Sequence, residues 1–283
     1  MSSIKPYIAL LKSRLSMTVA FSGAFGYLLA PIEHKPLGIF LISLAGFVLT
    51  GAANIVNQLK EIELDKLMKR TAQRPLPTET LTPAQARNFG YVLAVIAIGL
   101  LSYFTWKAAL VGLLSYILYG YVYTPLKRVG PISVFVGAIP GAMPPLLGWT
   151  AATGAITYEA LIIFGIQFVW QFPHFWAIAW VSDEDYKRAG FKLLPSGGGQ
   201  DLNTAIQIMI YTLFLLPLGL LPSYFGLVGL NSGIVATVCG VLFLAQTFSL
   251  MRDCSRKSAL KIMFGSFIYL PVVQIAYLLD KMP

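Results

Sequence analysis

The chain has little charge and almost no cysteine or histidine. Of its 283 residues, 12% are charged, two are cysteine and two are histidine. This scarcity of charge, with 57% hydrophobic residues and a mean hydropathy of +0.71, excludes an ordinary soluble domain and predicts a polytopic membrane protein. Cys239 and Cys254 form no CxxC or CxxCH pattern, so we expect reduced, structural cysteines rather than a disulfide or a covalently attached haem.

Acidic residues are scarcer than basic ones, and the net charge is +9. A charge of this sign suits nucleic acid only if the cations form one patch, and here they follow the predicted loops instead. Eighteen of the 21 cations fall on the side of the N-terminus, and only Lys35, Lys107 and Lys281 fall opposite. The positive-inside rule then predicts that the N-terminus and the cation-bearing loops lie in the cytoplasm and the C-terminus outside, and we expect a protein of the cytoplasmic (inner) membrane. We expect a lipid bilayer, and no nucleic acid, as partner.

Apolar stretches long enough to span a membrane are abundant, and we count about nine. They lie near residues 15–31, 37–57, 88–106, 108–124, 131–150, 157–181, 203–222, 232–251 and 259–279. The first stretch is better interpreted as a retained span than as a signal peptide, because no small-residue cleavage site follows it. We therefore predict an all-α fold, a single bundle and a single domain over residues 1–283.

One polar stretch, NIVNQLKEIELDKLMKRTAQRPLP at residues 54–77, interrupts this apolar pattern. If residues 38 to about 67 form one helix, Asn54, Asn57, Glu61 and Asp65 share a face, and Glu63 lies on another side. Carboxylate and carboxamide oxygens on that face suit Mg²⁺. The cations that follow suit phosphate oxygens; they are Lys66, Lys69, Arg70 and Arg74. The alternative is a charged membrane boundary whose side chains pair with each other.

A second polar stripe lies in the sixth apolar stretch, where Gln167, Gln171 and His174 recur at i, i+4 and i+7. Polar groups at membrane depth are costly and usually face the bundle interior, either at a site or in a hydrogen bond between helices. The helix then leaves the membrane through Asp183, Asp185, Lys187 and Arg188. A shift of 118 residues aligns Asp65 with Asp183 and Lys69-Arg70 with Lys187-Arg188. The alignment predicts a pseudo-repeat with halves at roughly 10–125 and 130–250, and one site built from both clusters.

Three further features add candidates to this site. The tyrosine-rich run at residues 116–123 fits an interfacial belt, but Tyr121 is also a candidate for the chamber, as is Trp176. Lys127 and Arg128 follow the tyrosine run on the expected face of the motif at residues 54–77 and are candidate anion ligands. Three prolines and three glycines at residues 137–148 predict a broken helix, tolerated in a membrane where it is buried or lines a cavity.

The motifs resemble those of the UbiA superfamily of intramembrane prenyltransferases, and within it the branch that farnesylates protohaem. The resemblance covers nearly the whole chain. It rests on NQ-x2-E-x3-D-x2-MKRT at 57–71, YTPLKR at 123–128, GA-x-PPLLGW at 141–149, PHFWAIAW at 173–180 and DY-x2-AG at 185–190. The chain departs from the usual Lys-Pro-Arg near the first span, where it has Lys12-Ser13-Arg14, and from Pro-Met-Leu-Pro-Val after the second motif.

The resemblance implies a central chamber, Mg²⁺ as cofactor, farnesyl diphosphate and haem b as substrates, and haem A synthase or oxidase assembly factors as candidate partners. It also implies roles for the residues in the motifs. Expected catalytic residues are Asn57, Glu61, Asp65, His174 and Asp185. Expected metal ligands are Asn57, Glu61, Asp65, Asp183 and Asp185. Expected diphosphate ligands are Lys69, Arg70, Arg74, Lys127, Arg128, Lys187 and Arg188. Expected acceptor or chamber residues are Asn54, Tyr121, Gln167, Gln171 and Trp176.

Two alternatives stay open at this point. One is a prenyltransferase for another aromatic acceptor, such as a hydroxybenzoate or a chlorin. The other is a secondary transporter, because repeats, broken helices and midplane polar residues also describe transporter folds. The charges of this chain gather at one interface, whereas a transporter places its binding groups near the middle of the membrane.

Overall fold

The described chain, residues 4–196 and 199–282 of a computed structural model, is built from helices joined by loops. The helices are α1 (Lys5–Leu10), α2 (Ser13–Leu29), α3 (Pro36–Lys60), α4 (Ile62–Leu67), α5 (Pro83–Phe104), α6 (Trp106–Ile117), the π-helix η1 (Leu118–Tyr123), α7 (Thr124–Leu126), α8 (Ile132–Thr153), α9 (Tyr158–Val181), α10 (Asp183–Arg188), α11 (Leu202–Tyr224), α12 (Leu230–Asp253) and α13 (Arg256–Leu279).

Eight helices within these described ranges are long and apolar enough to cross a membrane. One of them is the continuous segment of α6, η1 and α7, Trp106–Leu126. Helix α2, at 17 residues, is shorter than these eight but packs among them. The expected all-helical membrane bundle is therefore confirmed, and about nine spans is the count obtained when α2 is included.

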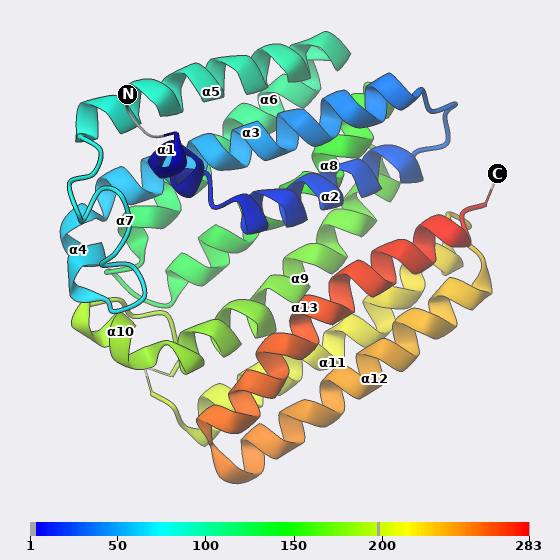
Figure 1. Cartoon of the computed structure of the whole chain (residues 1–283). Helices are drawn as coiled ribbons and strands as arrows, with labels where there is room; N and C mark the ends of the chain where they lie inside the picture. Colours follow the sequence, from blue (N-terminus) through cyan, green and yellow to red (C-terminus); the bar gives the residue numbers. More distant parts are fainter. Residues whose placement is uncertain (1–3, 197–198, 283) are drawn as a thin grey trace.

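The helices form one bundle (Figure 1). Helix α2 packs against α3 and α8, α3 packs against α5, and α5 and α8 both pack against α6. Helix α9 contacts α11 and α13, and α12 lies between these two. These two sets of helices, α2, α3, α5, α6 and α8 on one side and α9, α11, α12 and α13 on the other, meet where α8 packs on α9 and α2 packs on α13. Helices α4, α7 and α10 gather at one end of the bundle, which we call the polar end (Figure 1).

Hydrogen bonds between segments hold the polar end together. Gln58 Nε2 of α3 donates to the carbonyl of Leu10 at 2.8 Å. The backbone amide of Lys192 donates to the carbonyl of Lys127 at 2.9 Å. Arg256 Nε, at the α12–α13 junction, donates to the carbonyl of Val181 at 3.3 Å. The cation-bearing junctions that the sequence placed on one side of the membrane therefore lie together.

Helix α2 and helix α8 cross with their backbones in contact. A Cβ built on Gly148 would overlap the carbonyl oxygen of Gly23, and a Cβ on Gly26 would overlap the backbone of Pro145. Small residues permit this approach, which in a membrane provides packing energy that the hydrophobic effect does not supply between helices. The prolines of α8 do not interrupt this helix, which is continuous from Ile132 to Thr153, so the predicted break is not found.

The expected single helix over residues 38–67 is wrong, because it breaks at Glu61. Glu61 has φ −110° and ψ 16°, and α4 begins after it. Helix α9 ends in the same way at Ser182, with φ −103° and ψ 15°, and α10 follows. The two breaks are 121 residues apart, three more than the alignment of the sequence clusters, so Asp65 and Asp183 do not occupy equivalent positions after the breaks.

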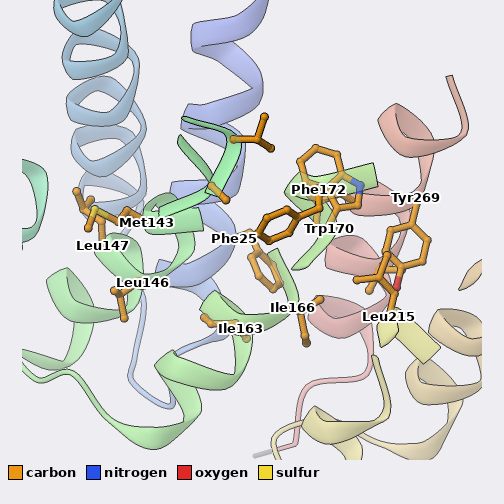
Figure 2. Close-up of a cluster of buried hydrophobic side chains, with 14 of the residues drawn as sticks. Phe25, Met143, Leu146, Leu147, Ile163, Ile166, Trp170, Phe172, Leu215 and Tyr269 are labelled. Carbon is orange, nitrogen blue, oxygen red and sulfur yellow. The ribbon is translucent and has the colours of Figure 1, made fainter. Parts of the chain in front are cut away.

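Apolar side chains fill the interior between α2, α8, α9, α11 and α13. Phe25, Ile166 and Trp170 point into the same cluster, with Leu215 and Tyr269 beside them (Figure 2). These side chains belong to one continuous buried apolar cluster between the helices.

Candidate functional site

A cavity of about 130 Å³ at the polar end brings together residues from four segments that are separate in sequence. Its polar lining carries both signs of charge. The lining residues are Lys12, Asn57, Glu61, Asp65, Met68, Arg70, Arg74, Tyr119, Tyr123, Lys127, Tyr186, Phe191 and Leu193. The predicted stripe of Asn57, Glu61 and Asp65 therefore faces one space, although the helix that carries it breaks at Glu61.

Asp65 is completely buried and is bound by Arg74 at two oxygens. Arg74 Nη1 lies 3.0 Å from Asp65 Oδ1 and 2.8 Å from Oδ2. The Asp65 side chain is 0% exposed and that of Arg74 is 20% exposed. Thr71 Oγ1 donates to the Asp65 carbonyl at 2.9 Å and ties the following loop to α4. The loop after α4 thus folds back and places Arg74 against the carboxylate of Asp65, nine residues earlier in the chain.

Glu61 is paired with Lys127 from the end of the fourth span. Lys127 Nζ lies 2.8 Å from Glu61 Oε1, and the two side chains are 12% and 5% exposed. Burial lowers the pKa of Lys127, but the Glu61 carboxylate outweighs this effect and the pKa is raised above its ordinary value. Lys127 Nζ also lies 5.1 Å from the centroid of the Tyr123 ring. The sequence correctly placed Lys127 beside the first motif.

Lys12 belongs to the same cavity, and sequence reasoning missed it. Its Nζ donates to Asn57 Oδ1 at 3.3 Å, and Asn57 Nδ2 donates in turn to Thr124 Oγ1 at 3.3 Å. Burial, with the nearby charges of Arg74 and Lys127, lowers the pKa of Lys12 to about 7. Lys12 was counted among the cations that predict the topology, although Lys12-Ser13-Arg14 stands where the family usually has Lys-Pro-Arg, which is the signal that could have identified it.

Two tyrosines of the π-helix, Tyr119 and Tyr123, line the cavity, whereas the predicted Tyr121 does not. Tyr121 is 42% exposed, and Lys60 Nζ lies over its ring at 4.5 Å. Tyr121 therefore lies outside this cavity, and its place in the acceptor chamber stays a prediction. The missed signal is spacing, because Tyr119, Tyr123 and Lys127 recur every four residues and share a helical face. Short π-helical segments are frequent at functional sites.

The second acidic cluster lies next to the first cavity but does not merge with it. Asp183 and Lys187 form an ion pair at 2.7 Å and line an adjacent cavity of about 270 Å³, which shares Tyr186 and Phe191 with the first. Asp185 accepts hydrogen bonds from the backbone amides of Lys69 at 3.2 Å and Arg70 at 3.4 Å. The structure thus brings the two predicted clusters into contact through Asp185.

The predicted diphosphate ligands divide into cavity residues and surface residues. Arg70, Arg74, Lys127 and Lys187 line one of the two cavities. Lys69, Arg128 and Arg188 are exposed at the polar end, and Arg188 pairs with Asp185 at 3.3 Å. Neither cavity has Lys69, Arg128 or Arg188 in its lining, and their role as diphosphate ligands stays a prediction.

The glutamines of α9 form hydrogen bonds with the backbone of α8. Pro145 has no N–H, so the carbonyl of Gly141 lacks its usual helical donor. Gln167 Nε2 and Gln171 Nε2 donate to that carbonyl at 2.8 and 2.7 Å. Gln167 Oε1 also accepts from Ser22 Oγ at 2.8 Å and from Gln274 Nε2 at 3.0 Å. Both glutamines therefore hold helices together, and their place in the acceptor chamber stays a prediction.

Asn54, His174 and Trp176 lie outside the two cavities. Asn54 Oδ1 accepts from the Tyr119 hydroxyl at 3.4 Å. His174 Nδ1 lies 2.9 Å from Ser266 Oγ of α13, and its ring stacks on Trp170 with centroids 4.3 Å apart. The ring of Trp176, in turn, lies against Phe172 and Tyr211. The structure shows a hydrogen bond between helices at His174, and the expected catalytic role of His174 stays a prediction.

The donor set of the cavity fits a hard divalent cation. Asn57, Glu61 and Asp65 offer only oxygen donors, which Mg²⁺ prefers, and they face one space. Across the described ranges 4–196 and 199–282, no three His, Cys, Asp or Glu side chains form a ready-made metal cluster. Each carboxylate is instead held by a cation of the protein, so a metal ion would have to displace Arg74 and Lys127 from Asp65 and Glu61.

Comparison with known proteins places these features in a family. The model described as the UbiA prenyltransferase family matches residues 19–270. A protein of Cytophaga hutchinsonii named protoheme IX farnesyltransferase is 52% identical, over 99% of this chain and 99% of that protein. Proteins with the same name from Christiangramia forsetii and Flavobacterium psychrophilum are 40% and 42% identical, over 99% and 95% of this chain and 94% and 92% of theirs.

Solved structures show the same fold. A structure described as that of digeranylgeranylglyceryl phosphate synthase superimposes with a TM-score of 0.82 at 20% identity, over 99% of both chains. A UbiA homologue from Archaeoglobus fulgidus bound to GPP and Mg²⁺ superimposes with a TM-score of 0.65 at 17% identity, over 96% of this chain and 99% of that one. At such identities the likeness concerns the arrangement of helices alone.

Proposed function

The chain belongs to the UbiA prenyltransferase family, and on that premise we propose that it transfers a farnesyl group from farnesyl diphosphate to a vinyl group of haem b. Water adds to the same vinyl group, and the products are haem O and diphosphate. Relatives named for this reaction are similar over nearly their whole length, which supports haem rather than another aromatic acceptor. Family membership also decides against a secondary transporter.

The observation that carries the proposal is the convergence of cations and oxygen donors on one buried cavity. Lys12, Arg74 and Lys127 come from three separate segments and surround Asn57, Glu61 and Asp65. Guanidinium and ammonium groups donate charge-assisted hydrogen bonds to phosphate oxygens. In a cavity shielded from bulk water these contacts are stronger than at an open surface. The arrangement suits an anion with several negative charges, such as a diphosphate.

In the proposed reaction the bond between farnesyl C1 and the diphosphate oxygen breaks, and both bonding electrons leave with the diphosphate. The haem vinyl group donates its π electrons to C1, and water captures the resulting cation and loses a proton. Arg74 and Lys127 bind the departing anion. The rings of Tyr119 and Tyr123 at the cavity wall present π faces that favour positive charge nearby.

Asn57, Glu61 and Asp65 are the residues we propose as Mg²⁺ ligands, with Asp183 of the adjacent cavity as a further carboxylate. The chemistry that Mg²⁺ supplies when bound is neutralisation of the charge that develops on the diphosphate. Asp185 positions the loop at Lys69 and Arg70 through their backbone amides. It contributes to the site by fixing this loop, which leads to Arg74.

We propose that the polar end faces the cytoplasm, because 18 of the 21 cations belong to segments on that side. The diphosphate group of the substrate then binds at the cytoplasmic end of the bundle, while the farnesyl chain lies among the apolar residues of the bundle. Haem A synthase and oxidase assembly factors are the candidate recipients of haem O.

The test is conversion by purified protein in detergent. Protein, Mg²⁺, haem b and farnesyl diphosphate should yield a haem product heavier by one farnesyl group and one hydroxyl group, detected by mass spectrometry. Parallel reactions with a hydroxybenzoate or a chlorin as acceptor are expected to give no product. Folded protein that farnesylates one of these and leaves haem unchanged would overturn the acceptor assignment.

A further inference from the structure

The larger cavity at the polar end, of about 270 Å³, combines lysine ammonium groups with apolar side chains. Its lining includes Asp183, Tyr186, Lys187, Phe191, Lys192 and Leu194. We propose that this cavity binds the carboxylate groups of the acceptor, and that Lys192 is the cation that receives them. The inference rests on the proposed function and assigns a separate binding site to the second substrate.

The chemistry of the acceptor suits a site at this place. Haem b carries two carboxylates on one edge of its ring and its vinyl groups on the opposite edge. A charged carboxylate is costly inside a membrane, so the carboxylate edge has to lie at the polar end of the bundle. A vinyl group that reacts beside the diphosphate then leaves the carboxylates in a neighbouring space. The larger cavity is such a space, because it shares Tyr186 and Phe191 with the smaller one.

The turn that ends α10 brings both lysines to this cavity. Gly190 has φ 71°, a left-handed conformation that glycine adopts without steric cost. The Gly190 amide donates to the Lys187 carbonyl at 3.1 Å, and the Phe191 amide donates to the Tyr186 carbonyl at 2.8 Å. These are the two hydrogen bonds of a Schellman motif, which stops a helix and turns the chain back. Lys192 therefore lines the same cavity as Lys187.

Contacts with the end of the fourth span fix the position of this turn. The Lys192 amide donates to the Lys127 carbonyl at 2.9 Å. The buried ring of Phe191 lies 5.3 Å from Lys127 Nζ, measured to the ring centroid. Since Lys127 lines the smaller cavity, the backbone at Lys192 is held at a set place beside the diphosphate site, while its side chain is exposed.

The charge of Lys192 is available to an incoming anion. Lys187 Nζ lies 2.7 Å from Asp183 Oδ2, so its charge is neutralised within the protein. Over residues 4–196 and 199–282, no ion pair includes Lys192. A carboxylate that enters the cavity therefore meets Lys192 without displacing another carboxylate. An ammonium group binds carboxylate and phosphate oxygens alike, so the experiment has to distinguish the acceptor from the diphosphate.

The experiment compares three ligands and three variants in detergent. Haem b carries both carboxylates, its dimethyl ester carries neither charge, and inorganic pyrophosphate with Mg²⁺ represents the diphosphate. Lys192→Glu reverses the charge and Lys192→Arg keeps it. Lys257→Glu is the matched control, because Lys257 is an exposed lysine of α13 that lines neither cavity. Quenching of tryptophan fluorescence reports binding of the two haems, and calorimetry reports binding of pyrophosphate.

Lys192→Glu is expected to weaken binding of haem b by roughly 10-fold, because it replaces an attraction in a cavity open to water with a repulsion. Its affinities for the dimethyl ester and for pyrophosphate should equal those of the unaltered protein, which also establishes that the variant is folded. Lys192→Arg should retain the affinity for haem b. Lys257→Glu should bind all three ligands as the unaltered protein does.

Three results would overturn the inference while leaving the proposed function intact. In the first, Lys192→Glu binds haem b as tightly as the unaltered protein. In the second, it loses equal affinity for haem b and for the ester, so that charge is not what the cavity recognises. In the third, it loses affinity for pyrophosphate rather than for haem b, which would assign the cavity to the diphosphate. Failure of the unaltered protein to convert haem b overturns the proposed function itself.

Discussion

Arg74 Nη1 contacts both carboxylate oxygens of Asp65, at 3.0 and 2.8 Å, and encloses a side chain with no exposed surface. The positive charge of Arg74 and the negative charge of Asp65 thus neutralise each other while no substrate is bound. Because removal of one partner from a buried ion pair leaves the other charge uncompensated, the pair links the stability of the polar end to its chemistry.

The first prediction concerns the two partners of this pair. Arg74→Met leaves the buried Asp65 carboxylate without its cation and should destabilise the protein by about 3–5 kcal/mol. Asp65→Asn should lower the melting temperature less, since the Arg74 side chain is 20% exposed and can reach water. Both variants should lose about 10²- to 10³-fold in turnover, typical of a lost transition-state contact.

Glu63→Gln is the matched control, because Glu63 lies on the same short helix but is 79% exposed and pairs with Lys66 at the surface. Its melting temperature and turnover should equal those of the unaltered protein. Normal turnover by a folded Asp65→Asn variant would contradict the role given to Asp65.

The second prediction concerns the order in which ligands bind. Mg²⁺ and diphosphate must exchange partners with the Asp65–Arg74 and Glu61–Lys127 pairs, so each should raise the affinity for the other. Titration of the protein with Mn²⁺, followed by electron paramagnetic resonance, should show weak binding alone and tighter binding with pyrophosphate.

Lys127→Met should reduce this coupling. The substitution frees Glu61 for the metal and removes a cation from the diphosphate, so binding of Mn²⁺ alone should tighten while the effect of pyrophosphate shrinks. Equal Mn²⁺ affinity with and without pyrophosphate in the unaltered protein would show that the ion pairs do not control binding.

The third prediction tests the crossing of α2 and α8. Gly148→Ala places a methyl group on the Gly23 carbonyl oxygen, a backbone atom that cannot move aside without shifting α2. We expect a large fall in melting temperature or a loss of folded protein. Gly99→Ala is the control, since nothing lies within 4 Å of its added methyl group. There the higher helix propensity of alanine should leave stability unchanged or slightly improved. Equal melting temperatures for the two variants would refute the close crossing.

The fourth prediction concerns pH at the end of the bundle opposite the site. Lys281 Nζ donates to the carbonyls of Leu28 and Ala30 at 3.0 and 2.6 Å and lies 3.3 Å from His34 Nε2. Burial, together with the charge of Lys281, lowers the pKa of His34 below 6.5. The unfolded chain therefore binds a proton at His34 more readily than the folded protein.

The sign follows from this difference. Stability is fully present above pH 6.5, falls as the pH drops below 6.5, and levels off below the lowered pKa of His34. Melting temperatures measured across this range should fall more steeply for the unaltered protein than for His34→Gln. Identical profiles for the two proteins would show that His34 does not contribute.

The sequence predicts the membrane bundle and most of the first motif because both depend on local pattern. Hydrophobic stretches of spanning length are sufficient to define helices in lipid, where backbone groups must bond within their own segment. Spacing of three and four residues places Asn57, Glu61 and Asp65 on one face even though the helix breaks between them. Lys127 could be added because both segments end on the same side of the membrane.

Local sequence does not predict the contacts that depend on distant segments. The Gly141 carbonyl, which lacks a helical donor, accepts hydrogen bonds from the side-chain amides of Gln167 and Gln171. The π-helical turn directs Tyr119 and Tyr123 inward and leaves Tyr121 outside. Both outcomes depend on the contacts of one helix with another.

The sequence alone determined the helical membrane fold, the side on which charge gathers and the stripe of carboxylates that ends at Asp65, since hydropathy and helical periodicity are properties of one segment at a time. Only the tertiary structure decided which cation meets which carboxylate, and that Lys12 belongs to the site. The reason is physical: an ion pair between segments is fixed by packing against other helices, which local sequence does not specify.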